Sequence, residues 1–97
     1  MKKRNWLVED NLVALYIALY EYKDLKYESE EIEEIVNHKG FDMRIKNFEY
    51  IVTNGRRGLS ARGQALSWKQ LYNIFKDFDQ KKFAELVNLI LEVKSRM

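Results

Sequence analysis

Few side chains in this sequence have the types and spacing that metal or acid–base chemistry needs. His38 is the one histidine and there is no cysteine, so a metal site would have to be built from carboxylates alone. Five glutamates stand at positions 28, 30, 31, 33 and 34. At helical spacing they point in several directions, which favours a solvated acidic face over a ligand cluster. We therefore predict no metal site, no cofactor and no enzymatic activity.

A second candidate is the glycine-arginine stretch from Gly55 to Gly58, because glycine-rich loops can cradle phosphate groups. It lacks the lysine-threonine ending of a nucleotide-binding loop, and no strand is predicted before it. Charge is nevertheless concentrated around it. Between Met43 and Lys69 there are six basic residues and a single acidic one, Glu49, although the net charge of the chain is only +2. A basic face of this kind attracts phosphate.

The elements that position these residues are predicted to be helices, because apolar residues recur mostly at spacings of three and four. We expect five helices, over about 7–22, 30–37, 42–53, 67–78 and from 80 towards the C-terminus. The first is apolar almost all round, which is typical of a central, buried helix. The predicted fold is all-α, one domain over 1–97, with a helix-turn-helix-like core of three helices plus two C-terminal helices. Predicted helix ends are the N-caps Ser29, Ser67 and Asp79 and the glycine stop Gly40.

The third predicted helix has one apolar and one polar face. Phe41, Ile45, Phe48 and Val52 fall within a narrow sector and are expected to be buried. The opposite side carries Met43, Lys46, Asn47, Tyr50 and Asn54, and Arg44 lies on the flank. Such a helix is typical of the recognition element of a helix-turn-helix.

Double-stranded DNA is the ligand that this pattern favours. Lys46 can neutralise phosphate, Asn47 can make a bidentate contact to adenine, and arginines on a flexible loop can follow the phosphate backbone or enter a minor groove. Two alternatives stay open: the loop charges only solubilise the surface, or Asn47 is a buried or capping residue that holds the helix to its neighbours. The predicted DNA-binding residues are Arg44, Lys46, Asn47, Tyr50, Asn54, Arg56, Arg57, Arg62 and Lys69.

Three short patches resemble a known family. Arg4-Asn5-Trp6 with the acidic pair Glu9-Asp10, the segment 43–50 (MRIKNFEY) and the segment 53–60 (TNGRRGLS) are similar to the helical N-terminal domain of many bacterial HNH endonucleases. The resemblance implies a module that directs a restriction-type nuclease to DNA, sometimes modified DNA. No nuclease follows Met97, so we expect an excised domain or a free-standing, non-catalytic relative in bacterial restriction or phage counter-defence.

The rival hypothesis is a protein-interaction module. A small phage or plasmid protein could occupy a host nuclease or regulator, using its apolar first and last helices or its glutamates as a nucleic-acid mimic. The last helix carries more apolar side chains than one packing face can hide, with Leu89 and Leu91 on opposite edges, so we also predict a homodimer or a docking surface there. No apolar run reaches the roughly 20 residues of a membrane span, and the sequence predicts a cytoplasmic protein.

Overall fold

The protein is built from α-helices. The computed structural model describes residues 6–60 and 66–97, which form five helices and no strand. The predicted all-α class is confirmed for these residues, and the ends of the helices lie within three residues of the predicted ones. The helices are α1 (Val8–Tyr20), α2 (Ser29–Val36), α3 (Phe41–Val52), α4 (Leu66–Phe75) and α5 (Gln80–Ser95).

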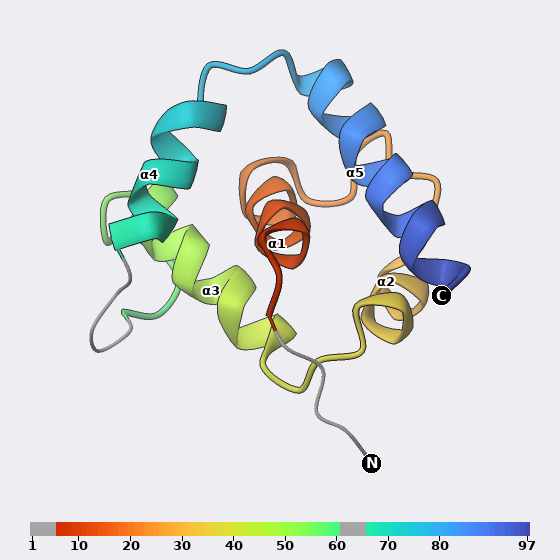
Figure 1. Cartoon of the computed structure of the whole chain (residues 1–97). Coiled ribbons are helices and arrows are strands. Elements are labelled where there is room, and N and C mark those ends of the chain that lie inside the picture. Colours follow the sequence, from red (N-terminus) through yellow and green to blue (C-terminus); the bar gives the residue numbers. More distant parts are fainter. Residues whose placement is uncertain (1–5, 61–65) are drawn as a thin grey trace.

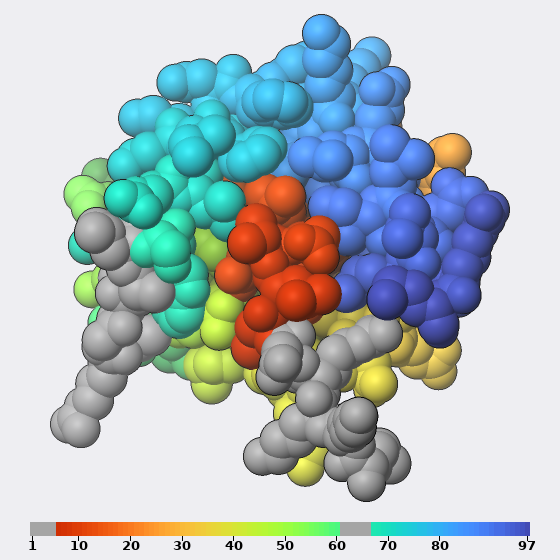
Figure 2. Space-filling view, in the orientation of Figure 1, coloured from red at the N-terminus to blue at the C-terminus, as the bar shows by residue number. Residues whose placement is uncertain are grey.

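Helix α1 is the centre of the fold, and the other four helices surround it (Figure 1). Its sequence is apolar almost all round, so every side of the helix can be buried against a neighbour. Helices α3 and α5 pack most extensively against it. The space-filling view shows the N-terminal end of α1 reaching the surface between α4 and α5 (Figure 2). The buried residues of α1 are Asp10, Leu12, Val13, Ala14, Leu15, Tyr16, Ile17 and Ala18.

A buried ion pair joins the start of α1 to the end of α5. Lys94 Nζ lies 3.0 Å from Asp10 Oδ1, and both side chains are almost fully buried. The second carboxylate oxygen of Asp10 accepts a hydrogen bond of 3.1 Å from the backbone N–H of Leu7. The carboxylate therefore caps α1 and pairs with a cation at the same time.

Aromatic rings join α4 to α5. The rings of Phe75 and Phe83 lie 4.9 Å apart between centroids, and Phe78 lies 6.1 Å from Phe83. The prediction that α4 extends to Phe78 is wrong, because the chain turns after Phe75, where the N–H of Phe78 donates to the Phe75 carbonyl at 3.0 Å. That turn brings both rings onto the same face of α5.

Two of the predicted N-cap residues lie inside the helices that they were expected to cap. Helix α2 is preceded by Glu28, whose backbone N–H donates to the Glu31 carboxylate at 3.0 Å, so Ser29 is the first helical residue and not the cap. Ser67 lies inside α4. Asp79 does occupy the N-cap of α5, although its side chain makes no capping hydrogen bond.

The predicted glycine stop after α2 is also wrong. The residue that ends this helix is Asn37, in the left-handed conformation with φ of 50°, which asparagine adopts more readily than most residues. Gly40 instead precedes α3 as its N-cap residue.

The two residues predicted on opposite edges of the apolar face of α5 differ in burial. Leu91 is fully buried beside Val87, and Val93 is 60% exposed. Leu89 is 58% exposed, as its position on the edge of the predicted stripe suggests. The inner face of α5 consists of Phe83, Ala84, Val87, Leu91 and Lys94.

The helix-turn-helix detail of the prediction is not confirmed. Residues 37–40 do join α2 and α3 by a short turn, but α3 packs mainly on α1, and α2 packs on α5. None of the helices in the described ranges is long and apolar enough to cross a membrane.

Candidate nucleic-acid interface

Residues 53–60 fold back onto α3. The N–H of Gly55 donates to the Tyr50 carbonyl at 2.8 Å, and the N–H of Leu59 donates to the Lys46 carbonyl at 3.1 Å. Within the turn, the N–H of Arg57 donates to Thr53 Oγ1 at 2.9 Å. This segment is therefore a folded turn held on α3 rather than the flexible loop that the sequence predicts.

Gly58 allows the turn to lie against α3. Its φ is +81°, in the left-handed region that favours glycine. A Cβ atom at this position would lie 2.2 Å from the Lys46 carbonyl oxygen and 2.7 Å from the backbone nitrogen of Tyr50. Both neighbours are helix backbone and cannot move aside, so no other residue type fits here without displacing the turn.

The prediction that Asn47 is exposed is wrong. Its side chain is only 6% exposed, and Nδ2 donates to the Leu59 carbonyl at 2.9 Å. The folded-back turn covers this side of α3, which the helical periodicity alone would leave open to solvent. The structure therefore matches the alternative reading, in which Asn47 is a buried residue that holds neighbouring segments together.

Arg44 is also held inside the fold. Its guanidinium lies between two tryptophan rings, 4.3 Å from the centroid of Trp6 and 4.2 Å from that of Trp68. It also donates a hydrogen bond to Asn11 Oδ1. Burial lowers the pKa of Arg44, yet an arginine stays protonated at neutral pH. The cation thus joins α1, α3 and α4, and the prediction that it lies ready to contact DNA does not fit this geometry.

Four of the predicted basic residues remain exposed at the surface. Lys46 lies 3.6 Å from Asp42, and Arg57 lies 3.6 Å from Glu49, in ion pairs open to solvent. Arg56 and Lys69 are exposed and form no ion pair with any residue that the structure describes. Exposed pairs of this kind are worth about 1 kcal/mol or less, so a phosphate group can replace the carboxylate partner. We call Lys46, Arg56, Arg57 and Lys69 the basic rim. Arg62, the remaining predicted residue, lies outside the described ranges.

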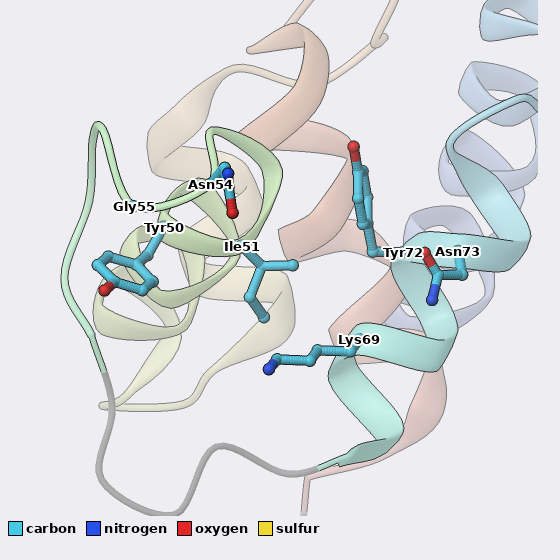
Figure 3. Close-up of a pocket in the computed structure, with 7 residues that line it drawn as sticks. All are labelled: Tyr50, Ile51, Asn54, Gly55, Lys69, Tyr72 and Asn73. Carbon is cyan, nitrogen blue, oxygen red and sulfur yellow. The ribbon is translucent and has the colours of Figure 1, made fainter.

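A cleft of about 330 Å³ opens between the end of α3 and the side of α4 (Figure 3). The side chain of Ile51 points from α3 towards α4, and Lys69 reaches back from α4 towards α3. Asn54 and Gly55, both with positive φ, form the turn at one edge. The cleft therefore brings together three of the predicted DNA-binding residues: Tyr50 of α3, Asn54 of the turn and Lys69 of α4. Its lining residues are Tyr50, Ile51, Asn54, Gly55, Lys69, Tyr72 and Asn73.

Four lining residues, Ile51, Gly55, Tyr72 and Asn73, are absent from the predicted DNA-binding residues. The spacing of Lys69, Tyr72 and Asn73, at i, i+3 and i+4, places all three on one face of a helix. That spacing is the signal in the sequence that could have identified Tyr72 and Asn73, although it does not show which element the two residues face.

The acidic run lies elsewhere on the molecule. All five glutamates between positions 28 and 34 are exposed, and α2, which carries four of them, packs against α5. Figure 1 shows α2 and α4 on opposite sides of α1. The helix that carries Lys69 and the helix that carries the glutamates therefore lie on different sides of α1.

Comparisons of the chain with protein-family models, with curated proteins and with solved structures found no match. Nothing in them links the chain to the helical domains of HNH endonucleases, so that resemblance stays a hypothesis. Within the described ranges, no three histidine or carboxylate side chains come together as a group that could hold a metal ion.

Proposed function

We propose that this protein binds DNA through the basic rim and the cleft that Lys69 of the rim lines. The observation that carries the proposal is the folded-back turn, because its hydrogen bonds to the Tyr50 and Lys46 carbonyls hold the segment with Arg56 and Arg57 against α3, whose C-terminal end lines the cleft. The position of α2 on the other side of α1 from α4 supports the same proposal, because an anion approaching Lys69 does not meet the acidic face.

The binding mode differs from the one that the sequence predicts. A helix-turn-helix needs the exposed face of its second helix to enter the major groove. Here the turn covers part of that face, and Asn47 is engaged with Leu59. We therefore place the contacts on the turn and on α4, as phosphate contacts that carry little sequence information. A role in restriction or counter-defence rests on the resemblance alone.

The number of cations in the basic rim sets the expected salt dependence of DNA binding. If all four rim residues contact phosphate, the slope of log affinity against log salt is about −3 to −4 on duplex DNA. Affinity then falls roughly 100-fold between 50 and 200 mM salt. A steeper slope would require cations beyond the rim.

The test is a titration of the whole chain with double-stranded, single-stranded and methylated DNA at two salt concentrations. Arg56→Ala and Lys69→Ala are each expected to weaken binding to all three and to flatten the salt slope by about one unit. Lys82→Ala is the matched control, because it removes the same charge from an exposed position on α5. Absence of binding at low salt, or an equal loss with Lys82→Ala, would contradict the proposal.

A second candidate function is protein binding, which one observation favours. Leu89, Val93 and Met97 form an exposed apolar stripe on α5 and its end. Nucleic-acid mimicry by the glutamates is supported less well. Helix α2 has eight residues and is only about 12 Å long, which covers about three to four base pairs of duplex.

A further inference from the structure

We infer that the cleft between α3 and α4 holds a single unpaired nucleotide, with the base between the two helices and the phosphate at Lys69. This inference rests on the proposed function, since it names the part of the DNA that the site recognises. It would make the protein a reader of bulged, mismatched or extruded bases rather than of an intact duplex.

The size and walls of the cleft fit one nucleotide. A volume of about 330 Å³ lies at the small end of the range of ligand sites, roughly 300–1,000 Å³. The half-buried side chains of Ile51 and Tyr72 provide an aliphatic wall and an aromatic ring. Stacking on such groups is a common way for proteins to bind unpaired bases of any sequence.

The polar side chains in the cleft have no hydrogen-bond partner among the residues that the structure describes. The side chains of Asn54, Asn73 and Tyr72 form no hydrogen bond with another described residue, and the same holds for Tyr50. An amide both donates and accepts hydrogen bonds, as does the edge of a nucleobase. Among the described residues of the lining, Lys69 alone is charged, so the ligand that suits the cleft carries a negative charge.

An unpaired nucleotide fits these groups better than a base pair does. In a duplex both faces of each base are covered by stacking, so a wall such as Tyr72 has no free face to contact. Extruding a paired base costs a few kcal/mol, and less at a mismatch or in a single strand. The cleft therefore predicts a preference for DNA in which the base is already unpaired.

The test compares three oligonucleotide duplexes of one sequence: fully paired, with a central one-nucleotide bulge, and with an abasic bulge. The abasic bulge has the same extra phosphate and flexibility but no base. We expect the base-containing bulge to bind about 10-fold tighter than the other two. Equal affinity for all three would overturn the inference and leave DNA binding intact, whereas no binding to any would overturn both.

Variants of the cleft residues test whether the cleft causes the preference for the bulged DNA. Asn73→Ala and Tyr72→Leu are each expected to reduce the ratio of bulge affinity to paired-duplex affinity several-fold. Gln70→Ala is the matched control, since Gln70 is exposed on α4 and does not line the cleft. Asn73 is itself exposed, so its variant is expected to fold even if Tyr72→Leu does not. A bulge preference that survives in folded Asn73→Ala would contradict the assignment.

Discussion

At the scale of single residues, three glycines differ in what their backbone positions require. Gly58→Ala places a Cβ on a residue whose φ is +81° and in a clash with helix backbone, and we expect it to lower the free energy of unfolding by about 2–4 kcal/mol. Gly55→Ala keeps a φ of +85° but meets only the end of the Tyr50 ring at 3.4 Å, so about 1 kcal/mol is expected. Urea unfolding of both variants measures the difference.

Gly40 provides the control for this series. Its φ is negative and the nearest atom to an added Cβ is a His38 ring nitrogen at 3.5 Å, so Gly40→Ala should change stability by about 0.5 kcal/mol or less. Hydrogen exchange shows whether Gly58→Ala also releases the turn from α3. In that case the amide of Leu59 loses its hydrogen bond to the Lys46 carbonyl and its protection from exchange. Full stability together with a protected Leu59 amide would contradict the account of Gly58.

At the scale of helices, the buried pair of Asp10 and Lys94 joins α1 to α5. Lys94→Met leaves a buried carboxylate without its cation, and a loss of about 3–5 kcal/mol is expected. The double variant Asp10→Asn/Lys94→Met leaves no charge behind, so it should recover most of that loss. Denaturant unfolding of the two single variants and the double variant gives the coupling free energy.

An exposed pair on the same helix is the matched comparison. Arg96 lies 2.7 Å from Glu92, four residues earlier, and both side chains are open to solvent. Arg96→Met should therefore cost about 0.5 kcal/mol or less. If Lys94→Met lowers the free energy of unfolding no more than Arg96→Met does, the buried pair contributes nothing to stability. Apolar packing alone would then hold α5 on α1.

The helices follow from the sequence, whereas much of the candidate site does not. Periodicity locates α3, and the unbroken apolar run over 12–20 locates α1, because both signals depend on residues of a single element. The burial of Asn47 depends on the turn that returns to α3, and the position of Arg44 depends on two tryptophans that are distant in sequence. A helical-wheel projection of α3 shows neither contact, because the partners of Asn47 and Arg44 lie outside that helix. Sequence therefore predicts which residues cluster along the chain, and tertiary packing decides which of them reach solvent.

At the scale of the whole molecule, α5 has apolar residues on two sides. Phe83, Val87 and Leu91 face the core, and a second stripe with the same spacing of four residues faces solvent. The members of this outer stripe are 58%, 60% and 84% exposed at positions 89, 93 and 97. Exposed apolar stripes of this kind mark contact surfaces on soluble proteins more often than scattered apolar residues do.

We expect the outer stripe to support weak self-association. Two side chains on α5 and one just past its end cannot supply the roughly 1,200 Å² that a stable interface buries, so the dimer should dissociate with a Kd above about 10 μM. Sedimentation across a range of concentrations measures this, and Leu89→Glu and Val93→Glu should each make the protein monomeric without loss of stability, because both positions are exposed. Glu85→Gln, also exposed on α5, is the control. A wild-type chain that stays monomeric at high concentration would contradict the dimer and leave the stripe as a docking surface for another protein or domain.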